Sequence, residues 1–514
     1  MRMRPARCHE PIPGALALSP SHPAEPRRRR SRWRGRTDAL TALAVLLVVG
    51  LLHAGTDVFG SLERRFYDQA STASDRLPSD RIAVIAIDDA SVASIGRWPW
   101  SRDVHAQLID RLSAAGAKTI AYTAFFFEPQ TDGALVPLRD LRGQIEGGAP
   151  GLEDLGPASR ERLLGFLGEA EARLDADARL ADSLTRSGRV ILPSVFELGE
   201  PRGRPDAPLP DFARRSAVED GSGFGLPAMR TQQPLPALGA AAAGLGHLNQ
   251  WLDDDGAVRR EPLLVQFDGH AVPSMALTIA AHSLNLSAAD IGLRPGNGLT
   301  LGPALIPTDE VARVLPQFYA DRDGASAFPT SAFHDVLAGR VPADALKGKI
   351  VLLGTTAPGL LDLRVTPVGE TYPGVETHAN LIASLLDGDI LVRPDYALGF
   401  EVLVLVASGL LLALALPMLS AAWAVALSLG VVGALVGLNL WLYIGHSLVL
   451  PLSTSLVMAA LAFALNMSYG YLVESRSKRE LAQLFGTYVP PELVDEMVKD
   501  PDRYSMAADA RELT

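Results

Sequence analysis

The chain has 514 residues, of which 47 are basic and 58 acidic, so its formal charge is −11. A hydrophobic share of 48% excludes intrinsic disorder for most of the chain, because ample apolar area is present to form packed cores. The single cysteine, Cys8, excludes a disulfide scaffold, and the acidic balance argues against a nucleic-acid-binding protein. A mean hydropathy of +0.16 is high for a soluble protein and favours membrane segments.

Residues 1–37 form a basic tail. It holds ten arginines against two glutamates, is rich in Pro and Ser, and shows no hydrophobic period. We predict a disordered cytoplasmic tail, because arginine clusters beside an apolar run are retained on the inner, anionic side of a membrane. A nucleic-acid-binding tail is the alternative.

Residues 38–58 are predicted to form the first transmembrane helix. Their strongly apolar centre, 39–52, is shorter than the ~20 residues that span a bilayer comfortably. A cleaved signal peptide is therefore the alternative, which we disfavour because the preceding polar tail is long for such a signal.

Residues 59–396 alternate short apolar runs with amphipathic stretches. This alternation is typical of an α/β domain with a largely parallel sheet and flanking helices. Two stretches rich in Pro and Gly, 128–168 and 197–236, are interpreted as surface excursions, partly helical or mobile. The predicted strands are 81–88, 117–127, 189–196, 260–267 and 348–354, and the predicted helices are 103–116, 174–187, one from about Ser274, and 374–387.

Candidate chemistry in this block is sparse. Asp88 and Asp89 end the first strand, where open α/β sheets place ligand-binding groups, although we favour a capping or turn role. Asp253–Asp255 with Gly256 suggest a metal cluster, but three consecutive carboxylates lack the spacing of a calcium loop, so we favour an Asp-Gly turn between strands. No HExxH, GxSxG or GxxxxGK[ST] motif occurs. We therefore expect no metal, no bound cofactor and no catalytic residue in this chain, and a domain that binds a ligand.

Three apolar runs follow, at residues 397–416, 421–443 and 448–470. Each is about long enough to span a bilayer, and the links between them, PMLS and IGHS, are so short that the helices must run up, down and up. Buried core helices are the alternative, disfavoured because consecutive runs of this length are rare in soluble cores.

Four spans from a cytoplasmic amino terminus bring the carboxyl terminus back to the cytoplasm and leave residues 59–396 outside. Arg476, Lys478 and Arg479 follow the last span, on the side predicted to be inside. The external block lacks cysteine, so we expect it to be stabilised by its own packed core.

Two features of the spans are candidates for function. Glu401 lies near the outer end of the second span, where an acid is a functional candidate, although solvation at the interface is the interpretation we favour. Gly433 and Gly437 have the spacing that lets helix backbones approach closely, within the hairpin or across a dimer.

Several segments carry a family resemblance: GRWPWSRDVHAQLIDRLSAAGAKTIAYTAFFFEP at 96–129, DDDGAVRREPLL at 253–264, and residues 348–391. With the three spans that follow, they resemble the CHASE2 extracytoplasmic sensor, over about residues 80–396. The resemblance implies an amino-terminal span, a sensor and three further spans ahead of a cytoplasmic signalling module. The family's usual aspartate in the strand after GAK is replaced here, where Tyr122 and Thr123 stand.

The tail, residues 471–514, resembles the entry to a class III adenylate/guanylate cyclase domain, through FGTYVPPELVDEM at 485–497 and the terminal RELT. In that family the metal-binding aspartates lie beyond the position of Thr514, so the resemblance assigns no catalytic residue to this chain. The intact cyclase would use ATP or GTP with two divalent metals (Mg or Mn), and its site between two subunits implies a homodimer. The tail itself is interpreted as a helix that transmits movement of the last span, with a passive tether as the alternative.

These observations predict a transmembrane receptor of the bacterial inner membrane that couples an external signal to cyclic nucleotide synthesis. A sensor for a kinase-type protein and a stand-alone membrane binding or scaffold protein are the alternatives. The expected partners are membrane lipid, an unidentified external ligand and a second copy of the chain, with no nucleic acid. The candidate sensor-pocket residues are Asp88, Asp89, Trp98, Arg102, His105, Asp362 and His378.

Overall fold

The computed structural model describes residues 55–465 apart from 131–132, 148–155, 202, 204, 323 and 361, together with 45, 48–49, 51–52 and 467–468. The chain divides into two units. The larger unit, Asp57–Val404 with Val432–Thr454, contains the α/β domain and the parts of the apolar helices that lie within those bounds.

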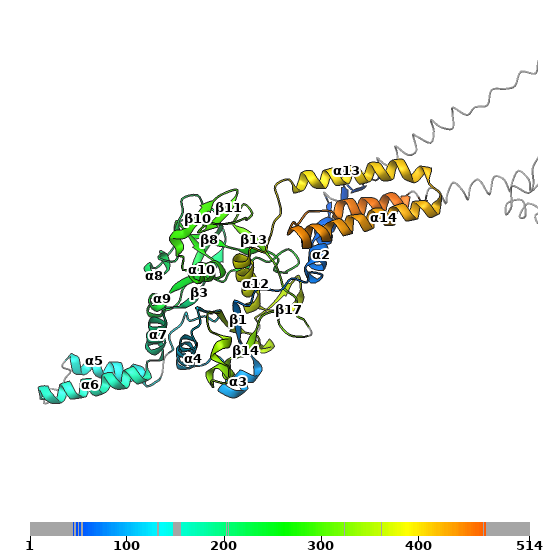
Figure 1. Ribbon diagram of the computed structural model, residues 1–514. Helices are drawn as coiled ribbons and strands as arrows, with labels where there is room; N and C mark the ends of the chain where they lie inside the picture. Colours follow the sequence, from blue (N-terminus) through cyan, green and yellow to red (C-terminus); the bar gives the residue numbers. More distant parts are fainter. Residues whose placement is uncertain are drawn as a thin grey trace, which may run out of the picture. The chain divides into compact units, whose positions relative to one another are not determined.

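The domain is built on a sheet whose central strands are all parallel. The strand order is β14-β1-β15-β2-β3, and β6 pairs in parallel with β3 (Figure 1). The predicted largely parallel α/β sheet is therefore confirmed. The bounds are β14 (Thr330–Ala332), β1 (Ile82–Ile87), β15 (Ile350–Thr355), β2 (Thr119–Tyr122), β3 (Val190–Leu198) and β6 (Gly244–His247).

Both faces of this sheet are covered, which explains why the central strands are apolar throughout. In β1, Ala83, Ile85 and Ile87 face one helical layer, while Ile82 and Val84 face the other. All six residues of the strand are buried, as expected for a parallel strand between two layers of helices. One layer contains α4 (Arg102–Ala114) and α7 (Ala176–Ser187), and the other contains α10 (Met275–Ser283) and α12 (Gly374–Asp387).

Local signals set the ends of these helices. The Ser274 side chain accepts the Leu277 N–H at the start of α10, and Asp175 accepts the Ala178 N–H at the start of α7. Gly188 ends α7 with φ +59°, a left-handed conformation that glycine adopts at low cost. The predicted helices at 174–187 and 374–387, and the one starting near Ser274, are confirmed within two residues.

The prediction of a surface excursion at 197–236 is wrong in part. Its residues 226–232 form a strand that pairs antiparallel with β3 and extends the main sheet, because β3 continues to Leu198 and offers its edge. The other excursion contains two helices that extend away from the sheet (Figure 1). The bounds are β4 (Val218–Glu219), β5 (Leu226–Gln232), β8 (Leu264–Phe267), β9 (His270–Pro273), α5 (Leu135–Glu146) and α6 (Pro157–Leu174).

Two predicted strands differ from the structure. The run 117–127 is a strand only to Tyr122, after which the chain leaves the sheet and Phe125, 49% exposed, stacks on Phe127. The run 260–267 is split between two sheets, because the chain turns at Leu263, whose N–H bonds to the Ala312 carbonyl. Apolar runs predict burial or aromatic stacking better than they predict which sheet a residue joins.

Smaller sheets and short helices complete the domain. The sheets are β10 (Ile291–Arg294), β11 (Gly298–Leu301) and β12 (Ala304–Ile306); β18 (Ile390–Leu391), β13 (Arg313–Pro316) and β7 (Glu261–Pro262); and β16 (Leu363–Thr366) with β17 (Gly369–Pro373). The helices are α2 (Val58–Thr72), α3 (Asp89–Ile95), α8 (Asp211–Arg214), α9 (Pro236–Ala241) and α11 (Phe333–Leu337), with 3-10 turns at Ala288–Asp290, Ala343–Ala345 and Pro358–Leu360.

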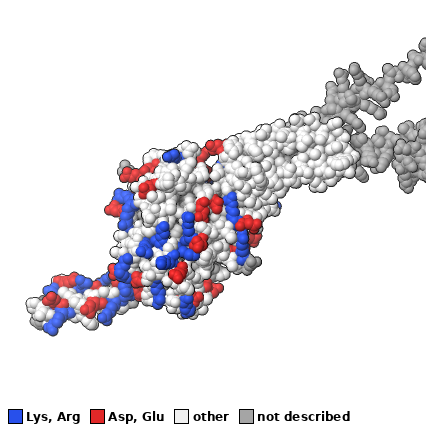
Figure 2. Space-filling model, viewed as in Figure 1, with Lys and Arg blue, Asp and Glu red and all other residues white. Residues whose placement is uncertain are grey.

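Two helices are long and apolar enough to cross a membrane: Ala397–Ala415 (α13) and Ala422–Gly445. The second comprises α14 (Ala421–Leu440) and a π-helical turn, Trp441–Gly445, and the 3-10 turn Leu416–Met418 follows α13. Figure 2 shows this part of the chain almost free of charged side chains, in contrast to the α/β domain.

Four spans are not established by the described residues. The predicted first span, 38–58, lies largely outside them. The last helix starts at Ser453 instead of 448 and is described as an apolar helix only to Leu465. It starts late because Leu448 forms a bridge with Val392 and Pro451 follows, and both features disfavour a helix before Ser453.

Candidate functional site

The carboxyl ends of β1, β2 and β15 lie at one edge of the sheet, the position where open α/β sheets bind ligands. Three of the predicted sensor-pocket residues, Trp98, Arg102 and His105, come together there. Trp98 lies in the loop before α4, and Arg102 and His105 lie in the first turns of that helix.

His105 is the centre of a group that we call the aromatic cluster. Its ring lies 5.8 Å from that of Trp98, 5.6 Å from Tyr122 and 5.4 Å from Phe126, each time edge to face. These are favourable geometries for aromatic pairs. The members are Trp98, Trp100, His105, Tyr122, Phe126 and Phe333.

Two polar atoms of this cluster are buried and have no hydrogen-bond partner among the described residues. They are Nδ1 of His105 and the hydroxyl oxygen of Tyr122, on side chains that are 1% and 0% exposed. Burial, with a smaller contribution from Arg102, lowers the pKa of His105 to about 3, so the imidazole is neutral at ordinary pH. An unpaired buried polar atom costs about 1–3 kcal/mol, and native proteins retain few of them.

Arg102 closes one side of the cluster. Its guanidinium lies 4.6 Å from the centre of the Phe126 ring and bonds to Asp177 of α7 at 3.3 Å and to the Glu128 carbonyl at 3.1 Å. Burial lowers the pKa of Arg102, partly offset by Asp177. The Arg102 guanidinium therefore holds the loop after β2 against α7.

Asp88 and Asp89 have structural positions. The Asp88 carboxylate accepts the Ser91 N–H at 2.8 Å and caps α3, the role that the sequence favoured, and Asp89 is exposed in the first turn of that helix.

The remaining two candidates belong to a second group, which we call the polar network. Asp362 pairs with Arg364 at 3.0 Å, and Arg364 donates to the Gln250 side chain at 2.6 Å. Gln250 in turn donates to Thr377 at 2.7 Å and to Glu261 at 3.4 Å. The network thus joins β16, α12 and the segment between β6 and β7.

Three buried titratable side chains lie in or beside this network: Glu261 is bonded to it through Gln250, whereas His378 and His247 are related to it by charge only. Burial raises the pKa of Glu261 to about 8. Burial also lowers the pKa of His378 to about 4, with a smaller contribution from Arg364, and that of His247 to about 3, with a contribution from His378. His247, Gln250, Glu261, Arg364 and Thr377 were not predicted, because they are scattered along the chain without a motif.

Asp253–Asp255 form a turn, as the sequence favoured, and two of the acids bind an arginine. Gly256 closes the turn with φ +79°, and its N–H bonds to the Asp253 carbonyl. Arg259, 5% exposed, donates to Asp253 at 3.2 Å, to Asp255 at 2.8 and 2.9 Å, and to Asp68 of α2 at 2.8 and 2.7 Å. We call these four residues the Arg259 cluster. Among the described residues no group of three or more His, Cys, Asp or Glu could hold a metal ion.

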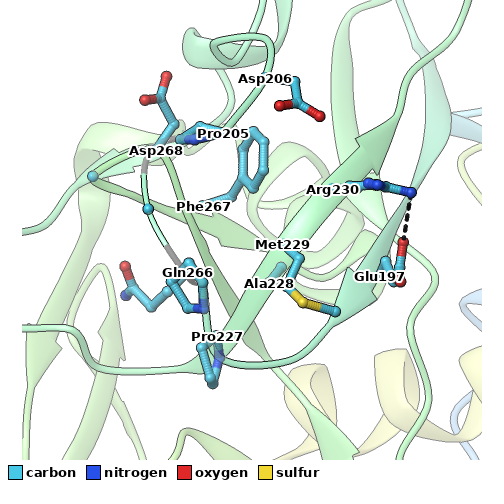
Figure 3. Close-up of a pocket in the computed structure, with 13 residues that line it drawn as sticks. Glu197, Pro205, Asp206, Pro227, Ala228, Met229, Arg230, Gln266, Phe267 and Asp268 are labelled. Carbon is cyan, nitrogen blue, oxygen red and sulfur yellow. Dashed lines mark ion pairs between the residues drawn. The ribbon is translucent and has the colours of Figure 1, made fainter.

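An open cavity of about 610 Å³ lies elsewhere, beside β3, β5 and the β8–β9 turn. Figure 3 shows the Arg230–Glu197 pair on one side and Asp206 and Asp268 on another, with Met229 and Phe267 between them. The charged pair is 3.9 Å apart and exposed, so it contributes little. None of these residues was predicted.

Helix α2 contacts the segment that precedes the last helix, and we call this contact the α2 junction. The Glu63 carboxylate accepts the N–H groups of Leu452 and Ser453, both at 2.8 Å, at the start of that helix. The buried Ser71 hydroxyl shares a hydrogen bond of 2.6 Å with that of Tyr443. Burial raises the pKa of Glu63, although the two N–H bonds partly oppose it.

The predicted membrane candidates are placed as follows. Glu401 accepts a hydrogen bond from the Thr454 hydroxyl, so this acid is solvated by a neighbouring helix. A Cβ added at Gly433 or Gly437 would meet no described atom within 4 Å, and their role in helix contact stays a prediction.

The fold and these sites define an α/β sensor-type domain followed by two apolar helices that could span a membrane. Comparison with protein families gives a match of residues 43–416 to the CHASE2 domain, and the chain belongs to that family. CHASE2 is an extracellular sensor domain of signalling proteins. Comparisons with curated proteins and with solved structures gave no match.

Proposed function

We propose that this chain is the input half of a transmembrane class III cyclase, in which the state of the external domain controls cyclic nucleotide synthesis in the cytoplasm. The α2 junction carries this proposal. It bonds the helix that follows the predicted first span to the start of the predicted last span, and the last span leads to the cytoplasmic tail.

The sensor core reaches the same helix from its other side. Arg259 holds Asp68 of α2 with two hydrogen bonds, and it lies in the segment between Gln250 and Glu261, which belong to the polar network. A change in the polar network can therefore reach α2 through the chain segment between Gln250 and Glu261, which carries Arg259, and then through the two hydrogen bonds from Arg259 to Asp68. Such a route supports coupling only if its elements have two arrangements that a signal populates differently.

The cyclase assignment is supported by the tail. The segment FGTYVPPELVDEM lies outside the described residues and resembles the entry to a class III catalytic domain. A homodimer follows from the proposal, because such catalytic sites form between two subunits. The two divalent metals and the nucleotide would be bound by the catalytic domain.

The test is a chimera that joins this chain, after Thr514, to a class III catalytic domain of known activity. It is expressed in a bacterium without its own cyclase, and cyclic AMP is measured. We expect Glu63→Ala to change the output by about fivefold or more, the range of ordinary allosteric coupling. Glu370→Ala is the matched control, because Glu370 is an exposed acid on β17.

Equal output from wild type and Glu63→Ala, at equal membrane abundance, would contradict the proposal. A second measurement tests the sidedness on which it depends. We expect alkaline phosphatase fused after Leu391 to be active and a fluorescent protein fused after Thr514 to fluoresce; the reverse pattern would exclude an external sensor with cytoplasmic ends.

A further inference from the structure

We propose that the aromatic cluster is the ligand site of this sensor, and that its ligand is a small neutral aromatic molecule with one hydroxyl or N–H group. The inference rests on the sensor role in the proposed function and is independent of the cyclase assignment. It starts from the two unpaired atoms, His105 Nδ1 and the Tyr122 hydroxyl oxygen.

The ligand must offer a hydrogen bond. The rings of His105 and Tyr122 are in edge-to-face contact, with their centroids 5.6 Å apart, so the two side chains are direct neighbours at the carboxyl edge of the sheet. A tyrosine hydroxyl both donates and accepts, and a neutral imidazole does one of these at each nitrogen. A ligand hydroxyl or N–H group placed between them would remove two unpaired polar atoms at once.

The ligand must also be neutral. A cation would meet the positive charge of Arg102, whose face toward the ring of Phe126 already occupies the favourable cation site. An anion would lose its hydration in exchange for a guanidinium whose charge is already balanced by Asp177. Both kinds of charge are therefore disfavoured.

The side chains around the two unpaired atoms are aromatic and meet edge to face, a geometry that is also favourable for a ring of the ligand. The rings other than Trp98 are at most 5% exposed, whereas Trp98 is half-buried in the loop before α4. A bound ring would therefore take the place of Trp98, with that side chain moved outward.

The experiment measures binding of 4-fluorophenol to the purified full chain in lipid nanodiscs by fluorine NMR, taking the fraction that unlabelled phenol displaces. Fluorobenzene, 4-fluorobenzoate and 4-fluorophenyltrimethylammonium test the polar group and the charge. We expect displaceable binding of 4-fluorophenol, at least about tenfold weaker binding of fluorobenzene, and none of the two ions.

Tyr122→Phe removes only the hydroxyl and should weaken 4-fluorophenol binding about five- to tenfold. Tyr319→Phe is the matched control, since its hydroxyl is also buried and unpaired but lies in the other core, and binding should stay at the wild-type level. No displaceable binding, or equal affinity of wild type and Tyr122→Phe, would overturn the proposal; a water molecule bonded to the two atoms would produce the first result. Because binding is read directly, a failure of the cyclase chimera leaves this test unaffected.

Discussion

The aromatic cluster and the Arg259 cluster both bury polar groups, but they satisfy them differently. Arg259 has five hydrogen bonds to three carboxylates, whereas His105 Nδ1 and the Tyr122 hydroxyl have none within the described part of the chain. The first arrangement joins α2 to the sensor core. The second lies at the ligand-binding edge of the sheet.

This difference teaches how to separate structural from functional burial in a domain without catalytic motifs. Breaking a buried ion pair strongly destabilises the folded protein, because the remaining charges stay buried without a partner. An unpaired buried hydroxyl can be removed at no cost, because no bond is lost. The polar network is an intermediate case, because the described residues give the buried Glu261 carboxylate one long hydrogen bond, from Gln250 at 3.4 Å. Four substitutions test the comparison.

Arg259→Met should have the largest effect. It leaves Asp68, Asp253 and Asp255 without their shared partner, and we expect the free energy of unfolding to fall by about 3 kcal/mol. Melting temperature of the purified chain in nanodiscs measures this. Arg230→Met, which removes an exposed pair 3.9 Å apart, should change it little. If Arg259→Met lowered the melting temperature no more than Arg230→Met does, the buried pairing of Arg259 would not contribute the stability that we assign to it.

Glu261→Gln should change how stability depends on pH. The pKa of Glu261 is about 8 in the folded chain, above its ordinary value, so the folded state binds the proton more tightly. Its contribution is fully present below about pH 4.5 and is lost as the pH rises to 8. The variant should flatten the fall in melting temperature over that window; an unchanged profile would show that Glu261 ionises normally.

Below pH 6.5 the histidines of the network act in the opposite direction. The pKa values of His247 and His378 are lowered to about 3 and 4, so their contribution is present above pH 6.5 and lost as the pH falls toward those values. The acid-side loss should therefore remain in Glu261→Gln, which provides an internal control for that variant.

Glu63→Gln should have a smaller effect at the α2 junction. The amide oxygen still accepts from Leu452 and Ser453 but lacks the charge, and we expect a loss of about 1 kcal/mol in the free energy of unfolding. Melting temperature is compared with that of Glu370→Gln, an exposed acid on β17 that should not change. Equal melting temperatures would show that the charge of Glu63 does not contribute.

Tyr122→Phe should have the smallest effect, with a melting temperature equal to or slightly above that of wild type, because the hydroxyl has no partner to lose. Tyr443→Phe gives the contrast: it breaks the 2.6 Å bond to Ser71 and should cost about 1 kcal/mol. A clear loss for Tyr122→Phe would mean that its hydroxyl is paired after all.

Much of the fold could be predicted, and the reasons are local. The strand at 81–88 and the helix at 374–387 were located almost to the residue, because full burial makes a strand apolar throughout and Gly388 adopts φ +76° after the helix. The strand predicted through Phe127 ends five residues early. The aromatic residues after Tyr122 pack against other rings and do not pair in the sheet. The hydrophobic pattern cannot distinguish these two roles.

The site was only partly predictable for the same reason. Trp98, Arg102 and His105 were located because they are close in sequence, but Tyr122 entered only as a departure from a family pattern. Of the polar network, Asp362 and His378 were predicted, but Gln250 and Thr377 were not, since the two bonded residues are 127 positions apart.

The sequence by itself determined the alternation of strands and helices, the apolar helices that can span a membrane and the family, because burial and hydropathy patterns are written into neighbouring residues. Only the tertiary structure decided which buried polar groups are paired. Arg259 meets Asp68 across 191 positions, while nothing in the described chain meets the Tyr122 hydroxyl. Pairing depends on distances between elements, and no local pattern contains those distances.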